Sequence, residues 1–187
     1  LYRDLEWLAS SELERQDIDR EVLVAKQNLH VAPNLTEDVD RDVTFHSKRT
    51  NRPLRLVFLS RISRKKNLDF ILKVLTKTTQ KLELTIYGAS EDRPYWEQCK
   101  KLIEQLPDSL NVRVCGHISH EQVHDTFRDH DLFVLPTRGE NFGHVIVESL
   151  SAGTPMIISD KTPWMSDDFG AVNVLPLDQK IWIETID

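Results

Sequence analysis

Apolar residues follow two alternating patterns from Leu54 to the end of the chain. Short, nearly continuous apolar runs are typical of strands buried on both faces of a sheet, whereas apolar residues three or four positions apart are typical of amphipathic helices. The expected strands cover residues 54–60, 82–87, 110–115, 131–135, 155–158 and 172–175. The expected helices cover residues 67–79, 94–106, 119–130 and 143–152, and a further helix starts near Asp178. This alternation predicts an α/β fold, with a Rossmann-like parallel sheet and helices on both faces.

The first part of the chain is less regular. Residues 1–20 are expected to be helical, and the helix proper starts at Ser11, because Ser11 and Glu14 have the spacing of a capping box. A short strand at residues 29–32 ends before a proline. Residues 35–53 carry many charges and few apolar side chains, which is typical of an exposed linker.

Size and composition indicate a soluble globular protein with one core. The chain has 187 residues, of which 40% are hydrophobic and 29% are charged. No apolar run approaches the ~18 residues that a membrane-spanning helix needs, and no signal peptide is visible. The net charge of −6 argues against general binding of nucleic acid. Cys99 and Cys115 lie in apolar segments, so we expect two reduced core cysteines in a cytoplasmic protein.

Residues 131–155 combine a strand, a loop and a helix in a way that suits anion binding. Pro136 ends the strand, since proline cannot donate to a sheet ladder, and Phe142-Gly143 starts the helix. A strand that enters a helix through a tight loop presents free backbone N–H groups to an anion. Glu140 in the loop and Glu148, about two turns along the helix, bracket this unit. The pattern fits either a plain α/β crossover with a surface loop or a site for a sugar nucleotide.

The two acids have a recognisable setting, with N-F-G after Glu140 and S-A-G-T-P after Glu148. This arrangement resembles the signature of retaining glycosyltransferases of the GT-B fold, in the nucleotide-sugar-dependent group often called family 4. The resemblance implies that residues 54–187 form the C-terminal, donor-binding domain of such an enzyme, and that residues 1–34 are the tail of an N-terminal domain. Because the chain starts at Leu1 rather than at a methionine and stops as its last helix begins, we expect a fragment whose C-terminal end is truncated.

A cluster of cations follows the first strand of the domain, in the sequence S-R-I-S-R-K-K-N-L. Ligands of open α/β sheets bind outside the carboxyl ends of the strands, where Arg61 and Lys66 would lie. The resemblance implies that these two side chains bind the donor diphosphate. Similar proteins have glycine where this chain has Ser60 and Asn67, and asparagine tolerates the left-handed conformation that glycine would adopt. The alternative is a solvated basic turn.

The resemblance also assigns the other residues of the expected site. Glu140 would hold sugar hydroxyls near the reacting carbon, and with Arg61 and Lys66 it makes up the expected catalytic group. Glu148 would accept hydrogen bonds from the ribose hydroxyls. The remaining donor-binding residues are Asn141, Phe142, Gly143, His144, Gly88 and Gly116. Backbone N–H groups around Gly143 would stabilise the leaving diphosphate together with the cations, so neither a metal ligand nor a metal cofactor is expected.

Two features stay open on the sequence alone. Gly88 and Gly116 each end a strand, where they either line the nucleotide pocket, as in similar proteins, or serve plain turn chemistry. Trp164, in the loop after the 155–158 strand, either stacks on the donor or packs against the protein.

The sequence H-E-Q-V-H, from His120 to His124, matches the zinc metalloprotease pattern with Glu121 in the catalytic position. His130 falls where a third zinc ligand would lie, but the longer pattern needs a glycine where this chain has Phe127. A capping box at the start of the same helix would also leave His120 exposed. A zinc protease is therefore only a remote alternative.

The expected function is that of a glycosyltransferase domain, of the kind found in polysaccharide biosynthesis, which binds a UDP-, GDP- or ADP-sugar. It would support transfer of the sugar to an acceptor with retention at the anomeric carbon. A saccharide or lipid-linked acceptor would bind through the missing N-terminal domain, so we expect this fragment alone to be inactive. We expect the intact enzyme to be cytoplasmic and peripheral to a membrane, without a transmembrane segment.

Two other classes stay open, namely a nucleotide-sugar epimerase of the same architecture and a non-catalytic sugar-nucleotide-binding module. A dehydrogenase is disfavoured, because no G-x-G-x-x-G motif follows a strand.

Overall fold

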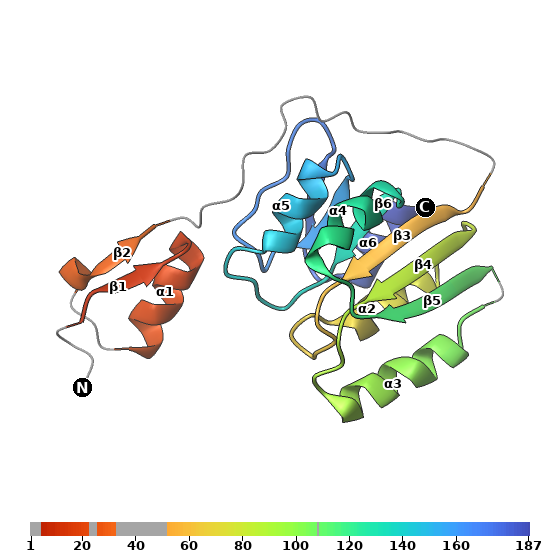
Figure 1. The fold of residues 1–187 in the computed structure, drawn as a ribbon, viewed down its shortest axis with the longest axis horizontal. Helices are drawn as coiled ribbons and strands as arrows, with labels where there is room; N and C mark the ends of the chain where they lie inside the picture. Colours follow the sequence, from red (N-terminus) through yellow and green to blue (C-terminus); the bar gives the residue numbers. More distant parts are fainter. Residues whose placement is uncertain (1–4, 23–25, 33–51, 108) are drawn as a thin grey trace.

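The computed structural model describes residues 5–22, 26–32, 52–107 and 109–187. Its main feature is a sheet of six parallel strands in the order β5-β4-β3-β6-β7-β8 (Figure 1). The strands are β3 (Leu54–Leu59), β4 (Leu82–Tyr87), β5 (Leu110–Gly116), β6 (Leu132–Leu135), β7 (Met156–Ser159) and β8 (Val172–Leu175). The predicted Rossmann-like parallel sheet is confirmed.

Helices cover both faces of this sheet, as the periodicity predicts (Figure 1). The helices are α2 (Leu68–Leu75), α3 (Arg93–Glu104), α4 (His120–Arg128), α5 (His144–Ser151) and α6 (Gln179–Ile186). The buried side chains of α2, α3 and α6 belong to one hydrophobic cluster, and those of α4 and α5 belong to another. None of the helices in the described ranges is long and apolar enough to cross a membrane.

Aromatic pairs anchor the two cores. On one face, the fully buried Trp182 of α6 meets Phe70 of α2 edge-on, with ring centroids 5.4 Å apart. On the other face, Phe127 of α4 meets Phe133 of β6 edge-on at 5.1 Å. Edge-to-face contacts between buried rings add to the stabilisation from burial alone. Of the two cysteines expected in the core, Cys99 is buried but Cys115 is exposed, because β5 lies at the edge of the sheet.

Local interactions explain where two of the helices begin and end. The helix expected at residues 67–79 ends at Leu75, because the hydroxyls of Thr76 and Thr78 donate to the carbonyl oxygens of Lys73 and Leu75 at 2.8 and 2.9 Å. Such bonds compete with continuation of the helix. At the start of α4, the predicted capping box is present, and the N–H of Ser119 donates to the side chain of Gln122 at 3.2 Å.

The N-terminal segment differs from the sequence prediction. It contains β1 (Trp7–Ala9), α1 (Glu12–Glu21), a short 3-10 helix (Lys26–Asn28) and β2 (Leu29–Val31), with β1 and β2 paired in parallel. A helix over residues 1–20 is therefore wrong at β1, since pairing with a distant strand overrides local preference there. The helix start at Ser11 is confirmed, because the Ser11 hydroxyl accepts from the N–H of Glu14 at 3.2 Å. Residues 1–4 and most of the expected linker lie outside the described residues.

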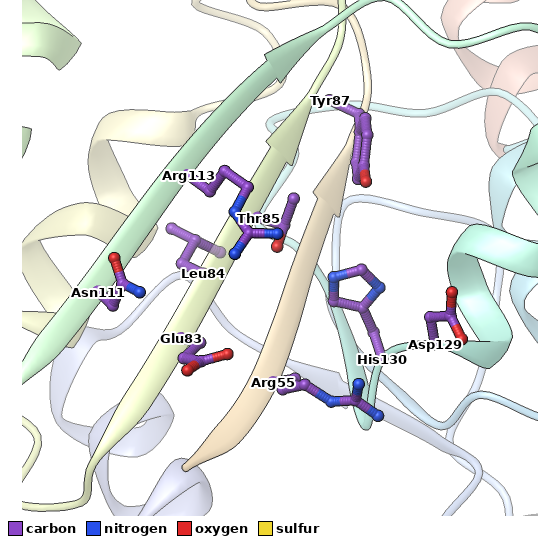
Figure 2. Close-up of a pocket in the computed structure, with 9 residues that line it drawn as sticks. All are labelled: Arg55, Glu83, Leu84, Thr85, Tyr87, Asn111, Arg113, Asp129 and His130. Atoms are coloured by element: carbon purple, nitrogen blue, oxygen red, sulfur yellow. The ribbon is translucent and has the colours of Figure 1, made fainter.

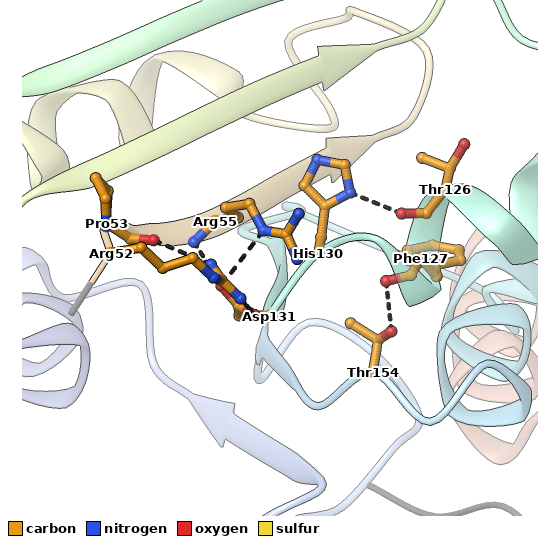
Figure 3. A network of polar contacts seen from close by, with 8 residues as sticks. All are labelled: Arg52, Pro53, Arg55, Thr126, Phe127, His130, Asp131 and Thr154. Carbon is orange, nitrogen blue, oxygen red and sulfur yellow. Dashed lines mark hydrogen bonds and ion pairs between the residues drawn. The ribbon is translucent and has the colours of Figure 1, made fainter. Parts of the chain in front are cut away.

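A charged network fixes the start of β6 (Figure 3). The carboxylate of Asp131 accepts two bonds of 2.6 Å from the guanidinium of Arg52 and one of 2.8 Å from the backbone N–H of Arg55. Burial raises the pKa of Asp131, but these hydrogen bonds outweigh burial and leave the pKa below its usual value. Burial also lowers the pKa of the neighbouring His130, whose Nδ1 lies 2.6 Å from the carbonyl oxygen of Thr126. This network holds the strand that leads into the loop of Glu140.

Candidate functional site

The loop after β3 and the loop after β6 are bound to each other at the centre of the sheet. Here the strand order reverses direction along the chain, which is the usual position of ligand sites in open α/β sheets. The carbonyl oxygen of Lys65 accepts from the N–H of Arg138 at 2.7 Å and from the hydroxyl of Thr137 at 3.2 Å. The side chain of Asn67 donates to the carbonyl oxygen of Pro136 at 3.0 Å. The basic loop and the acid-bearing loop therefore form one structural unit.

Asn67 shows why a glycine is not needed in this loop. Its backbone is left-handed, with φ 62° and ψ 38°, and the described residues include no other non-glycine residue with a positive φ. Asparagine is one of the few residues that adopt this conformation at low cost. The Oδ1 of Asn67 also accepts from Nε of Arg138 at 3.1 Å, so its side chain ties the two loops together.

Lys66 and Glu140, two of the three expected catalytic residues, are in direct contact. The ammonium of Lys66 donates to Oε2 of Glu140, and the two side chains are only 10% and 16% exposed. A pair of opposite charges so little exposed to water is screened weakly by salt. The structure thus brings together the cation expected at the diphosphate and the acid expected at the sugar.

Arg61, the third expected catalytic residue, does not join this pair. Its side chain is 67% exposed and makes an ion pair of 3.0 Å with Glu91. An isolated bridge between Ile62 and Ser90 joins the loop after β3 to the loop after β4, and it sets Arg61 beside Glu91. An exposed ion pair of this kind is weak, so the guanidinium is free to exchange partners.

The start of α5 carries four of the expected donor-binding residues. Gly143 has φ 83°, and a Cβ there would lie 2.7 Å from Cδ1 of Ile146 and 3.1 Å from Cγ of Glu140. Phe142 and His144 are in edge contact, with ring centroids 5.0 Å apart. The left-handed glycine lets the chain turn from Glu140 directly into the helix.

Trp164 packs against this turn. Its indole N–H donates to the carbonyl oxygen of Phe142 at 2.6 Å, and the two rings lie 6.1 Å apart. Of the two roles left open by the sequence, the structure therefore shows packing.

Asn141 binds a residue that the sequence does not connect with the site. Its side-chain N–H donates to Oε1 of Glu14 in α1 at 2.7 Å, although 127 positions separate the two residues. Hydrogen bonds from Ser10, and then from Asn141, lower the pKa of Glu14. The N-terminal segment thus contacts the loop after β6, and no short-range pattern could have indicated this contact.

The two strand-end glycines differ in their surroundings. The N–H of Gly88 donates to the carbonyl oxygen of Gly116 at 2.8 Å. A Cβ at Gly88 would lie 1.9 Å from the carbonyl oxygen of Ser60, whereas a Cβ at Gly116 would meet no atom within 4 Å. Gly88 is therefore required by the close approach of the basic loop, and Gly116, with φ 73°, by its backbone conformation alone.

Glu148 lies beside the helix with the H-E-x-x-H sequence. Nδ1 of His120 is 3.5 Å from Oε1 of Glu148, and Nε2 of His124 is 3.4 Å from the carbonyl oxygen of Ser151. Within the described ranges, no three His, Cys, Asp or Glu side chains gather closely enough to hold a metal ion. Both histidines of the motif face α5, so the geometry does not favour the zinc-protease alternative.

The described residues line one cavity away from this group and another that includes Phe142. One, of about 380 Å³, lies along the face of β3, β4 and β5 that α4 leaves open (Figure 2). Its lining residues are Arg55, Glu83, Leu84, Thr85, Tyr87, Asn111, Arg113, Asp129 and His130, and none of them is an expected site residue. The other, of about 480 Å³, is lined by Ser10, Ser11, Phe142 and residues 163–166. The second cavity therefore adjoins the loop after β6, and it lies between the start of α1 and the loop of Trp164.

The fold and the paired loops define one half of a GT-B glycosyltransferase. The chain belongs to the glycosyl transferases group 1 family, whose sequence model matches residues 40–169. The resemblance seen in the sequence is thus confirmed.

Curated relatives include the D-inositol 3-phosphate glycosyltransferase of Xylanimonas cellulosilytica, 24% identical over 96% of this chain and 47% of the relative. They also include the alpha-D-kanosaminyltransferase of Streptomyces kanamyceticus, 23% identical over 78% of this chain and 40% of the relative. This chain thus spans less than half the length of these two relatives.

Solved structures show the same fold. Anabaena HepE in complex with UDP and glucose aligns with a TM-score of 0.78 at 16% identity, over 96% of this chain and 52% of that one. The lipopolysaccharide outer core galactosyltransferase WaaB aligns with a TM-score of 0.72 at 20% identity, over 97% of this chain and 52% of that one.

Proposed function

We propose that this chain is the donor-binding part of a glycosyltransferase that uses a nucleoside-diphosphate sugar and transfers the sugar with retention at the anomeric carbon. The contact between Lys66 and Glu140 carries the proposal, since it joins the expected phosphate-binding loop to the expected sugar-binding loop. Membership of the glycosyl transferases group 1 family supports it. The bound UDP and glucose of HepE, a protein of the same fold, agree with a donor of this class.

In this proposal, cations and helix amides stabilise the leaving diphosphate. Negative charge develops on the diphosphate as the bond to the sugar breaks, and preorganised positive groups lower the energy of that state. Lys66 lies at the junction of the two loops, the N-terminus of α5 follows Gly143, and Arg61 is exposed nearby in sequence. We propose that these groups bind the diphosphate without a divalent metal.

The two acids have separate roles in the proposed mechanism. Glu140 binds hydroxyls of the donor sugar near the reacting carbon, and Glu148 accepts hydrogen bonds from the ribose. Because Lys66 already contacts Glu140, diphosphate and sugar would bind on either side of one ion pair. When the donor is bound, the Lys66 ammonium would contact both the Glu140 carboxylate and a phosphate of the donor.

A saccharide or lipid-linked acceptor would bind on the side of the N-terminal segment. Glu14 of α1 contacts Asn141 there, and the cavity of about 480 Å³ opens between Ser10, Ser11 and Phe142. Transfer would need a further domain to complete this side, so we propose that the 187-residue chain binds the donor but does not turn it over.

Titration calorimetry of the 187-residue chain with UDP, GDP and ADP tests the proposal. We expect one of the three to bind, with no change on addition of EDTA. The double variant Lys66→Met with Glu140→Gln removes the cation without leaving an unpaired carboxylate, and it should bind at least about tenfold more weakly. Lys65→Met, at the exposed neighbouring lysine, is the matched control and should bind normally. Binding that EDTA abolishes and magnesium restores would contradict the proposed role of Lys66.

A test of retention at the anomeric carbon needs a protein that includes the proposed further domain. The anomeric configuration of its product, read by NMR from a UDP-, GDP- or ADP-sugar of known configuration, tests this part. A product with the opposite configuration, or an epimerised nucleotide sugar without transfer, would refute it.

A further inference from the structure

The histidines of the H-E-x-x-H sequence both point from α4 to α5. His124 approaches the carbonyl oxygen of Ser151, at the last turn of α5, with Nε2 3.4 Å away. His120, at the first turn of α4, approaches the carboxylate of Glu148, with Nδ1 3.5 Å from Oε1. His124 therefore joins the two helices through a backbone group, whereas His120 meets the side chain that we propose binds the ribose.

His120 is well placed to reach a ligand of Glu148. It is the first residue of α4, and the capping box of Ser119 and Gln122 fixes the position at which that helix begins. Its side chain is 81% exposed, while the Glu148 side chain is 28% exposed. Among the described residues, the imidazole of His120 has no polar partner besides Glu148. One edge of the ring is thus beside the carboxylate, and the rest is accessible to a bound molecule.

The two side chains have complementary hydrogen-bonding groups for a vicinal diol. A carboxylate only accepts hydrogen bonds, whereas a neutral imidazole has one N–H donor and one acceptor nitrogen. Each hydroxyl of a ribose both donates and accepts. Glu148 can accept from the hydroxyls, and the Nδ1–H of His120, which lies 3.5 Å from Oε1 of Glu148, can donate to the oxygen of a hydroxyl bound between the two side chains.

We propose that His120 binds the ribose hydroxyls together with Glu148. It would thereby be a specificity-determining residue that favours ribonucleotides over 2′-deoxyribonucleotides. The proposal rests on the donor site described above and adds a residue from a different helix to it. A site that hydrogen-bonds a hydroxyl discriminates against the analogue that lacks it, because the polar groups of the site are then left unpaired. If His120 only stabilised the surface, its removal would not change this discrimination, since an exposed His–carboxylate contact is weak.

The test is a comparison of each ribonucleotide with its 2′-deoxy form. Calorimetry would measure the affinity of the 187-residue chain for whichever of UDP, GDP and ADP binds, and for the matching 2′-deoxynucleoside diphosphate. In the unchanged protein, we expect the ribonucleotide to bind more tightly. In His120→Ala, the ratio of the two affinities should fall about threefold to tenfold, the effect of one lost hydrogen bond.

Two further variants make the result specific. His120→Gln keeps an N–H donor and should recover part of the ratio. His124→Ala alters the other histidine of the same helix, and it should leave the ratio unchanged. Circular dichroism and thermal unfolding would show that each variant is folded.

The outcomes distinguish the two proposals. If the unchanged protein binds nucleoside diphosphates and His120→Ala weakens both forms equally, or neither, the role of His120 is refuted while the donor site stands. If the unchanged protein binds none of the three nucleoside diphosphates, the proposed function fails, and the role of His120 fails with it.

Discussion

The ammonium of Lys66 contacts the carboxylate of Glu140, although 74 positions separate the two residues in the sequence. Both side chains are nearly buried, so neither charge is well solvated without the other. Loss of one partner of such a pair leaves an uncompensated charge away from water. The energetic consequence is therefore larger for removing one residue than for removing both.

Lys66→Met should lower the free energy of unfolding by roughly 3 kcal/mol, because it strands the Glu140 carboxylate. Adding Glu140→Gln to that variant should recover most of the loss. Urea denaturation of the two single variants and the double variant measures this coupling. Additive effects of the two substitutions would show that the ion pair does not hold the loops together.

Glu140→Gln alone should tighten the binding of a nucleoside diphosphate about threefold to tenfold, since it removes a negative charge beside the proposed phosphate-binding lysine. From the sequence alone we would expect almost no change, because the partner of Glu140 would be the sugar. Calorimetry with UDP, GDP and ADP measures the effect. Glu184→Gln, at an exposed position of α6, controls for the change in net charge. Weaker binding by Glu140→Gln would mean that the carboxylate itself helps to hold the nucleotide.

Gly88→Ala should be far more destabilising than Gly116→Ala. The added Cβ would lie 1.9 Å from the carbonyl oxygen of Ser60 at Gly88, so the basic loop would have to move. At Gly116 the space is open, and only the left-handed backbone costs energy, about 1–2 kcal/mol. We expect a loss of at least about 3 kcal/mol for Gly88→Ala in urea denaturation. Equal losses at the two positions would show that the contact with Ser60 relaxes easily.

Acid should destabilise the fold in two stages. Burial lowers the pKa of His130, so the unfolded chain takes up a proton at this residue near pH ~6.5, before the folded chain does. Stability therefore falls as the pH drops from that value toward the lower pKa of the folded state. His130→Gln should flatten the dependence in the range just below about pH 6.5. Thermal unfolding across this range, compared with the unchanged protein, is the measurement, and identical pH profiles would contradict the assignment.

The second stage belongs to the carboxylates. The pKa of Asp131 is lowered in the folded state, so its stabilising contribution is complete above its ordinary pKa of ~3.9 and is lost as the pH falls through the folded value. Asp131→Asn should lower stability at neutral pH and show a weaker further loss below about pH 4. A full loss there in Asp131→Asn would assign this stage to other acids, such as Asp69, whose pKa is also lowered.

Local patterns were sufficient to predict the six strands of the main sheet and the helices between them, because each depends on neighbouring residues. The left-handed backbone of Asn67 agrees with the resemblance, which places a glycine at this position. Contacts between distant segments were not predictable in this way. The bond from Asn141 to Glu14 and the pairing that makes β1 a strand join residues with no shared local pattern. Cys115 was misjudged, because an apolar neighbourhood does not reveal that β5 lies at the edge of the sheet.

The position of Trp182 has a consequence for how the protein is made. This side chain covers α2, the helix that the basic loop enters, and it is supplied by α6. Strands β3, β4 and β5 are consecutive and pair as neighbours, so they can assemble while later residues are still being added. At roughly 5–20 residues per second, the ribosome delivers α6 on the order of ten seconds after Lys66. Throughout that interval the nascent chain has its basic loop but lacks the packing of Trp182 against α2, so the proposed binding of nucleotide would arise late in synthesis.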